Sequence, residues 1–195
     1  PGTKVFAITG RGRMSGVVEV EMGTTLKSIL EDIVDGIKDG KEFKAIQLGG
    51  ASGSFITSED IETSVDFDAM KLKGFGMGAG GFVVIDETSC MVDLVRFYME
   101  FIRNESCGKC IPCREGTGRM LEILESVIRK PANEDSGTTL ERFKGVMQLE
   151  TISAVMKDTS LCGLGQTAPN PFVSALKNFR EEFEEHIFDR KCKAN

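Results

Sequence analysis

Residues 4–33 read KVFAITGRGRMSGVVEVEMGTTLKSILEDI, which combines two strand-like runs with one helix-like run. The strand-like runs are Lys4–Thr9 and Gly16–Glu21, and the second alternates apolar with polar residues as one arm of a hairpin does. After the turn-forming Gly23, apolar residues recur at the i, i+3, i+4, i+7 spacing of one helical face: Leu26, Ile29, Leu30 and Ile33. The stretch therefore predicts a β-hairpin followed by an amphipathic helix.

The residues that follow add strands to this beginning. Lys44–Leu48 predicts a third strand that ends at a glycine pair, and Phe55–Thr57 predicts a further short one. A strand–strand–helix–strand order is typical of a compact α+β module of the β-grasp kind. We therefore assign residues 1–87 to a β-grasp domain.

A glycine-dense passage precedes the last predicted strand of this half, Phe82–Ile85. Gly76, Gly78 and Gly81 formally spell G-x-G-x-x-G. A dinucleotide site needs this motif after a strand and at the start of a helix, so that the pyrophosphate meets the helix N-terminus. Because the motif here leads into a strand, it predicts a close-packed backbone passage between domains and no nucleotide site.

The second half changes to helical periodicity. A polar loop is predicted at Pro131–Gly137, and the glutamates of the last helix are expected to face water. Four segments carry an apolar helical face: Met91–Ile102, Arg114–Lys130, Thr139–Met156, and a last helix with Asn170 as N-cap and Pro171 at its first position. Residues 88–195 are therefore predicted to form an all-α helical bundle.

Composition excludes several classes of protein. A formal net charge of −6 argues against a broad nucleic-acid-binding face. The sequence has neither a long apolar run nor a signal-peptide pattern, so we expect a cytoplasmic protein without direct membrane insertion. A single histidine, His186, nearly excludes histidine-based catalysis. Because the chain starts at Pro1 without a methionine, we expect a piece of a longer protein.

The chemistry of the chain concentrates in ESCGKCIPCREG at Glu105–Gly116. Cys107, Cys110 and Cys113 form C-x2-C-x2-C, and Cys162 stands far downstream in TSLCGLGQT. Three closely spaced thiolates with one remote thiolate predict the ligands of a [4Fe–4S] cluster. Structural zinc usually shows two separated C-x2-C pairs or a pair with histidines, and disulfides are typical of secreted chains.

The loop residues between the cysteines suit a cluster as well. Gly108 lets the backbone approach inorganic sulfide, and backbone N–H groups of such a loop can donate hydrogen bonds to cluster sulfurs. Lys109 and Arg114 place positive charge beside a unit of net negative charge. Both effects favour the reduced cluster.

Three further residues have two interpretations each. Cys90 is expected to be a small buried apolar side chain of the first helix, in preference to a metal ligand. His186 and Cys192 form H-x5-C, which is half of a second metal site; alternatively, His186 caps a helix C-terminus and Cys192 belongs to the tail. The spacing alone leaves this choice open.

These motifs resemble a known family over essentially the whole chain. SCGKCIPCREG followed by SLCGLGQTAPNP resembles the C-terminal part of the NADH-binding flavoprotein subunit of respiratory complex I and its relatives. Within that family, ETSCMVD and FREEFEEHIFDRKC are similar to the soluble NAD(P)-linked or electron-bifurcating [FeFe] hydrogenases and the NAD-dependent formate dehydrogenases. The resemblance implies a soluble ligand-binding β-grasp domain followed by a helical iron–sulfur domain.

The same resemblance implies cofactors and partners. Cys107, Cys110, Cys113 and Cys162 would hold the [4Fe–4S] cluster that exchanges single electrons with FMN. The FMN and NAD(P)H sites of the full-length subunit would precede Pro1, so no residue here is assigned to them and the chain alone is not expected to oxidise NAD(P)H. The implied partners are a thioredoxin-like [2Fe–2S] subunit and hydrogenase, formate dehydrogenase or complex I-type iron–sulfur subunits.

The resemblance also bears on the second metal site. In the hydrogenase-type relatives a cysteine at the place of Cys192 begins C-P-A-G, and a His and Cys pair there can help to bind zinc or a second cluster. Here Cys192 is followed by Lys-Ala-Asn, which departs from that pattern. The sequence thus predicts an electron-transfer fragment of an oxidoreductase. The alternative is a binding module whose metal site is structural or redox-sensing.

Overall fold

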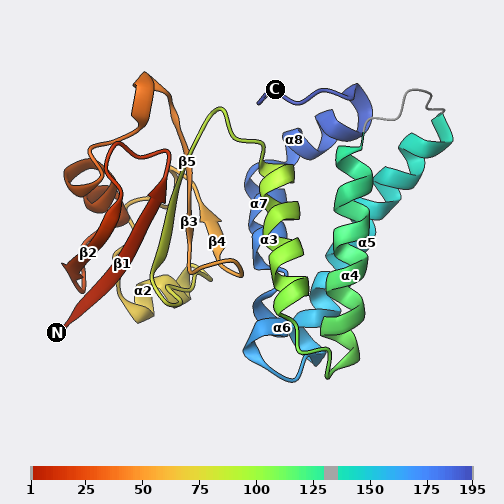
Figure 1. Ribbon diagram of the computed structural model, residues 1–195, viewed down its shortest axis with the longest axis horizontal. Helices are drawn as coiled ribbons and strands as arrows, with labels where there is room; N and C mark the ends of the chain where they lie inside the picture. The colour runs from red at the N-terminus through yellow and green to blue at the C-terminus, as the bar shows by residue number, and fades with distance from the viewer. Residues whose placement is uncertain (1, 130–135, 195) are drawn as a thin grey trace. The chain divides into compact units, whose positions relative to one another are not determined.

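The computed structural model describes residues 2–129 and 136–194, which divide into two compact units, Pro1–Ser89 and Cys90–Asn195 (Figure 1). Unit 1 is a mixed α+β fold and unit 2 is helical. Within the described ranges, no helix is both long and apolar enough to cross a membrane.

Unit 1 is built on one five-stranded sheet in the order β2-β1-β5-β3-β4. The hairpin strands β1 and β2 pair antiparallel, and β1 pairs parallel with β5, which in turn pairs antiparallel with β3. The strands are β1 (Thr3–Gly10), β2 (Gly16–Glu21), β3 (Phe43–Leu48), β4 (Ser54–Ile56) and β5 (Gly81–Asp86). Every strand predicted from sequence is present, with ends that differ by at most one residue.

The core of unit 1 lies between the sheet and the predicted helix. Thr25 caps this helix by accepting the Ser28 N–H at 3.1 Å. It begins as α1 (Leu26–Ser28) and continues as a π-helical turn, η1 (Ile29–Ile33). The fully buried core side chains of sheet and helix include Phe6, Ile46, Phe82, Leu26 and Ile29.

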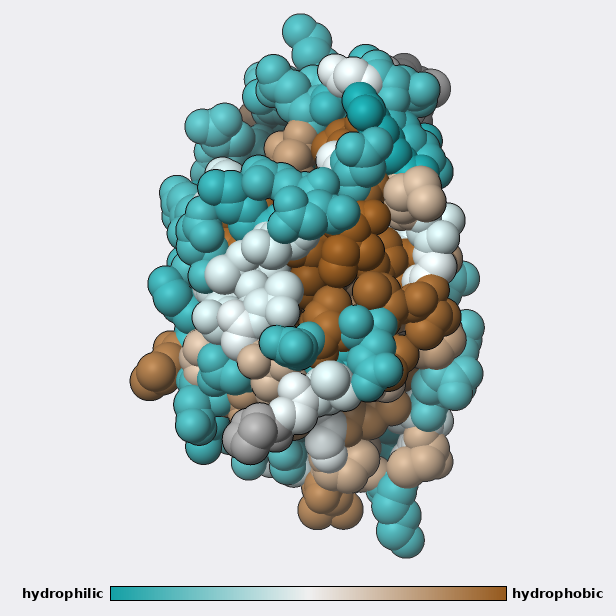
Figure 2. Space-filling view, turned by 90° about the vertical axis from the view of Figure 1, so that its left-hand side faces the viewer, coloured by the Kyte–Doolittle hydropathy of each residue, from teal (hydrophilic) through white to brown (hydrophobic). Residues whose placement is uncertain are grey.

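On the face of the molecule shown in Figure 2, apolar side chains gather in a patch bordered by polar ones.

Two features of unit 1 differ from the sequence prediction. A short helix, α2 (Phe67–Leu72), was not predicted because it buries little besides Met70; Asp66 caps it by accepting the Ala69 N–H at 2.8 Å. The glycine passage lies inside unit 1, not between domains. As predicted, the passage leads into a strand, β5. It is also close-packed, because a Cβ on Gly78 would lie 2.4 Å from the Gly49 carbonyl oxygen, so two backbone segments touch there.

Unit 2 consists of helices that pack their apolar faces together. Buried side chains of three helices, among them Val95, Leu124 and Phe172, form its core. The helices of unit 2 are α3 (Met91–Glu105), α4 (Ile111–Ile128), α5 (Ser136–Thr159), α6 (Gly163–Thr167), α7 (Asn170–Asn178), α8 (Arg180–Glu184) and the π-helical η3 (Glu185–Asp189). A 3-10 turn, η2 (Lys38–Gly40), belongs to unit 1. Most of the predicted loop Pro131–Gly137 lies outside the described residues, and its last two residues begin α5.

The C-terminal helix differs from the prediction in three respects. Its N-cap is Pro169 and Asn170 is its first residue, so Asn170 is not the cap. The helix also breaks at Phe179, whose φ and ψ of −135° and 36° are not helical. Finally, Glu182 does not simply face water: its carboxylate accepts the Met91 N–H at 3.0 Å, which places a negative charge at the N-terminus of α3.

Candidate metal centre

The three cysteines of the C-x2-C-x2-C motif lie where α3 ends and α4 begins. Cys110 is the N-cap of α4 and Cys113 lies in its first turn, while Cys107 is exposed in the connecting loop. Gly108 has φ +70°, a left-handed conformation that glycine adopts without strain. Ser106 accepts the Gly108 N–H at 3.3 Å and fixes the loop. The loop thus turns sharply between two cysteines, as the motif requires.

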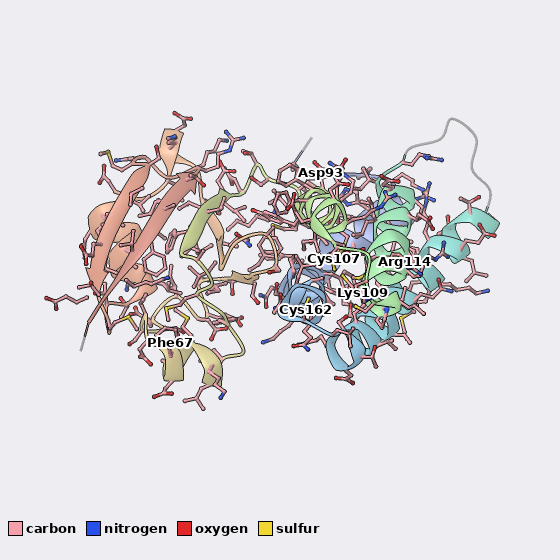
Figure 3. All side chains as sticks on the ribbon, turned by 60° about the horizontal axis from the view of Figure 1, so that its bottom comes forward. Phe67, Asp93, Cys107, Lys109, Arg114 and Cys162 are labelled. Carbon is pink, nitrogen blue, oxygen red and sulfur yellow. The ribbon has the colours of Figure 1, made fainter. Side chains whose placement is uncertain are left out.

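The remote Cys162 comes to the same place through the loop before α6. It is the N-cap of α6, a helix that contacts α4. The backbone N–H groups of Leu161, Cys113 and Cys110 hydrogen-bond the Cys110 thiol and, against the opposing effect of burial, lower its pKa. The donor from Leu161 ties the Cys162 loop directly to the triplet. Figures 1 and 3 show the α3–α4 connection and α6 at the same end of the helical unit.

No three of these four cysteine sulfurs lie within 4.8 Å of one another. Tetrahedral zinc with bonds of about 2.3 Å holds its sulfur ligands about 3.8 Å apart. Across residues 2–129 and 136–194, the one group of three or more ligand atoms within 4.8 Å of one another does not include any of the four. A cluster in which each thiolate binds a different iron spreads its ligands further. The donor set therefore fits a [4Fe–4S] cluster better than zinc.

Charged and polar side chains surround the triplet. Arg114 donates a hydrogen bond to the Gly108 carbonyl at 3.3 Å, which holds the loop against α4. Its guanidinium also forms an ion pair with Glu115 at 2.9 Å. Ser106, which sequence reasoning missed, lies with its hydroxyl 3.3 Å from the Cys113 sulfur. Figure 3 shows Lys109 and Arg114 near Cys107. The surroundings thus supply both positive charge and a hydroxyl donor to the thiolates.

A second group of ligand atoms lies elsewhere in unit 2. It comprises Cys90, His186 and Cys192, whose ligand atoms all lie within 4.8 Å of one another. The prediction that Cys90 is a buried apolar core residue is wrong. Cys90 is partly exposed, caps α3 by accepting the Asp93 N–H at 3.4 Å, and holds its sulfur 3.4 Å from His186 Nε2. The reason is positional, because Cys90 precedes the first helical residue and so lies outside the buried stripe.

His186 is oriented as a ligand would be. The ring is buried, and Nδ1 lies 2.6 Å from the Glu182 carbonyl oxygen. A carbonyl can only accept, so Nδ1 carries a proton, and in the neutral ring Nε2, 3.4 Å from the Cys90 sulfur, is the nitrogen with a free lone pair. A metal-bound histidine usually donates its other N–H to a carbonyl in this way. The C-cap residue of η3 is Arg190, and His186 is the basic residue of its last turn, so His186 lies at this helix end in both interpretations.

A known family matches most of the helical unit. Residues 93–186 match the family described as the NADH-ubiquinone oxidoreductase-F iron-sulfur binding region. The match contains the triplet Cys107, Cys110 and Cys113 together with Cys162, and it confirms the resemblance inferred from the motifs.

Known proteins are similar to this chain over nearly its full length. The chain is 42% identical over 194 residues to the NADP-reducing hydrogenase subunit HndC of Solidesulfovibrio fructosivorans, covering 100% of this chain and 38% of that protein. It is 36% identical over 192 residues to the F 2 subunit of the NADH-quinone oxidoreductase of Rhizobium meliloti (strain 1021), covering 98% of this chain and 44% of that protein. The chain thus spans about two fifths of the length of these relatives.

A solved structure supports the fold. The NAD+-reducing [NiFe]-hydrogenase in its H2-reduced state matches 95% of this chain and 30% of its own chain, with a TM-score of 0.76 and 24% identity. At this identity the likeness shows the fold alone. The mixed α+β architecture with a five-stranded sheet and several helices is therefore one that a hydrogenase chain also contains.

Proposed function

We propose that this chain relays single electrons through one [4Fe–4S] cluster held by Cys107, Cys110, Cys113 and Cys162. One observation carries the proposal: the backbone N–H next to the remote Cys162, that of Leu161, hydrogen-bonds the thiol of Cys110 in the triplet. Two segments about 50 residues apart thus meet at their cysteines, as the single-plus-triplet pattern of ligands requires. No three of the four sulfurs lie within 4.8 Å of one another, and an iron–sulfur family matches these residues; both support the proposal further.

A bound cluster of this type supplies reversible one-electron chemistry. The chain's own residues set the conditions for it. Backbone N–H groups and the start of α4 favour the thiolate form of Cys110. Cys113 is buried while Cys107 and Cys162 are exposed, so one side of the ligand set is fixed in the helical core and the other faces solvent. An exposed side gives a redox partner a short path for electrons.

The finer fold assignment is part of the same proposal. We propose that residues 1–87 are a β-grasp domain of the soluble ligand-binding type and that residues 88–195 are a helical bundle domain. The parallel pairing of β1 with β5, next to a β1–β2 hairpin and its following helix, supports the first. The separation of the chain into compact units at Ser89 and Cys90 supports a boundary close to the predicted one.

We propose FMN and NAD(P)H as cofactors of the longer protein, and iron–sulfur subunits, including a thioredoxin-like [2Fe–2S] subunit, as partners. The relatives are named as subunits of NADP-reducing hydrogenase and NADH-quinone oxidoreductase, which supports a multi-subunit oxidoreductase. The apolar patch in Figure 2 is of the kind that marks protein contact surfaces. All six cysteines are free thiols, which supports a reducing compartment such as the cytoplasm.

The test of this function is reversible reduction. Anaerobic reconstitution of the 195-residue chain with iron and sulfide is expected to load about four irons and give a visible absorbance that dithionite bleaches. A midpoint potential between about −700 and +450 mV is expected in a redox titration. A site that takes zinc and no iron would contradict the proposal. A cluster that assembles but cannot be reduced would instead favour the binding module with a structural metal.

We propose a second, structural metal site at Cys90, His186 and Cys192, with zinc as its ion. The observation that favours it is the convergence of one imidazole nitrogen and two sulfurs from the two ends of unit 2. Cysteine sulfur and neutral histidine are the ligands of structural zinc, which binds four groups. The described residues provide three such groups within 4.8 Å, so a fourth ligand or a water would complete the site.

The zinc proposal predicts one equivalent of zinc per chain in protein purified without chelator. Cys192→Ser is expected to lower zinc affinity by at least the 10–100-fold that loss of an outer-shell partner costs. Zinc content by elemental analysis measures this, with unchanged iron as the internal control. Equal zinc content in wild type and C192S would show that these residues do not bind it.

A further inference from the structure

The side chain of Ser160 is a buried hydroxyl without a partner. In the part of the chain that the structure describes, only two buried side-chain oxygen or nitrogen atoms lack a hydrogen bond, Gln47 Oε1 and Ser160 Oγ. Ser160 is 5% exposed. Since buried polar groups are nearly always hydrogen-bonded, an unpaired hydroxyl at this position calls for a ligand that the protein atoms do not supply.

The backbone of Ser160 is fully engaged, so the residue is fixed in place. Its N–H donates to the Met156 carbonyl at 3.1 Å, and its own carbonyl accepts from Gln166 Nε2 at 3.0 Å. Ser153, a buried serine of α5, donates its hydroxyl to the Leu149 carbonyl at 2.6 Å. The missing bond of Ser160 is therefore confined to its side chain.

The hydroxyl lies on the side of the helical unit that carries the cluster cysteines. A Cβ placed on Gly165 would lie 2.6 Å from Ser160 Oγ and 3.0 Å from Cys113 Cβ, so the hydroxyl and Cys113 flank the same glycine. The next residue, Leu161, donates its N–H to the Cys110 thiol. Cys162 follows two residues after Ser160. Ser160 thus adjoins the segments that carry three of the four proposed ligands.

We propose that the Ser160 O–H donates a hydrogen bond to a sulfur of the bound cluster or of its thiolates and thereby raises its reduction potential. This inference rests on the proposed function of the four cysteines. Hydrogen bonds to the sulfurs stabilise the more negative, reduced state and so set the potential. Ser106 acts alongside it, because its hydroxyl already contacts the Cys113 sulfur. Ser160 is a positioning residue that tunes the cluster without binding iron.

The test compares midpoint potentials of anaerobically reconstituted wild type, Ser160→Ala, Ser160→Thr and the control Ser153→Ala, by redox titration followed with electron paramagnetic resonance. S160A is expected to shift the potential to a more negative value. S160T keeps the hydroxyl and S153A lies at a satisfied site, so both are expected to keep the wild-type potential. The titration reads only the loaded fraction, so partial loading does not affect it.

Each remaining outcome separates this inference from the proposed function. A loaded S160A protein with the wild-type potential would overturn the inference and leave the ligand assignment intact. An S160T potential equal to that of S160A would do the same. Complete loss of iron in S160A alone would also overturn it, because a tuning bond does not hold a cluster bound by four thiolates. Wild type without iron would instead refute the proposed function.

Discussion

Replacing Cys162 by serine is expected to leave the helical unit folded while the chain loses most of its iron. Cys162 is exposed, and as N-cap of α6 its side chain makes no capping hydrogen bond. Serine is a favoured N-cap residue, so the free energy of unfolding of the metal-free chain should change by about 0.5 kcal/mol or less. The cluster, in contrast, loses a direct ligand. Its affinity should fall by more than the 10–100-fold typical of outer-shell partners.

Cys90→Ser is the matched control for C162S. Both changes remove one partly or fully exposed thiol at a helix N-cap in unit 2. If the two metal sites are distinct, C162S keeps zinc and loses iron, whereas C90S loses zinc and keeps iron. Elemental analysis and visible absorbance of the reconstituted variants measure both metals in one preparation. Equal loss of iron in both variants would show that the ligand assignment is wrong.

Local patterns explain why much of this architecture was predictable. The hairpin and the helix after Gly23 follow from period-2 and period-3.6 spacing, which the backbone of each segment enforces alone. The cysteine triplet is equally local, since C-x2-C-x2-C fits one loop and one helical turn. For these elements, the chemistry and the structure come from the same few consecutive residues.

Elements that depend on distant contacts were less predictable. The helices α2 and α6 have six and five residues, too short for an apolar period to be detected. The approach of Cys90 to His186 joins residues 96 apart, and no local pattern encodes it. The position of Cys90 was the one available signal for its role. Cys90 lies at the start of the predicted first helix and could have been identified as its N-cap. The role of Glu182 at the start of α3 is non-local in the same way.

Gly165→Ala is expected to destabilise the metal-free chain and to impair cluster binding together. A Cβ at this position would lie 2.6 Å from both Cβ and Oγ of Ser160 and 3.0 Å from Cβ of Cys113. The two Cβ atoms are bonded to the backbone and cannot rotate away, so α6 or its neighbours must shift. Overpacking of this kind costs about 1–3 kcal/mol, which exceeds the roughly 1 kcal/mol that alanine gains over glycine in a helix. Denaturant unfolding measures the net loss.

Gly118→Ala separates packing from helix propensity. Gly118 lies inside α4, where nothing lies within 4 Å of an added Cβ, so alanine should stabilise the chain by up to about 1 kcal/mol and leave iron content unchanged. The two glycine variants should therefore change stability with opposite signs. Because α6 begins directly after Cys162, displacement of α6 in G165A also moves the fourth ligand away from the triplet, and iron content should fall. A G165A chain as stable as G118A and fully loaded would mean that the contact between Gly165 and Ser160 does not position Cys162.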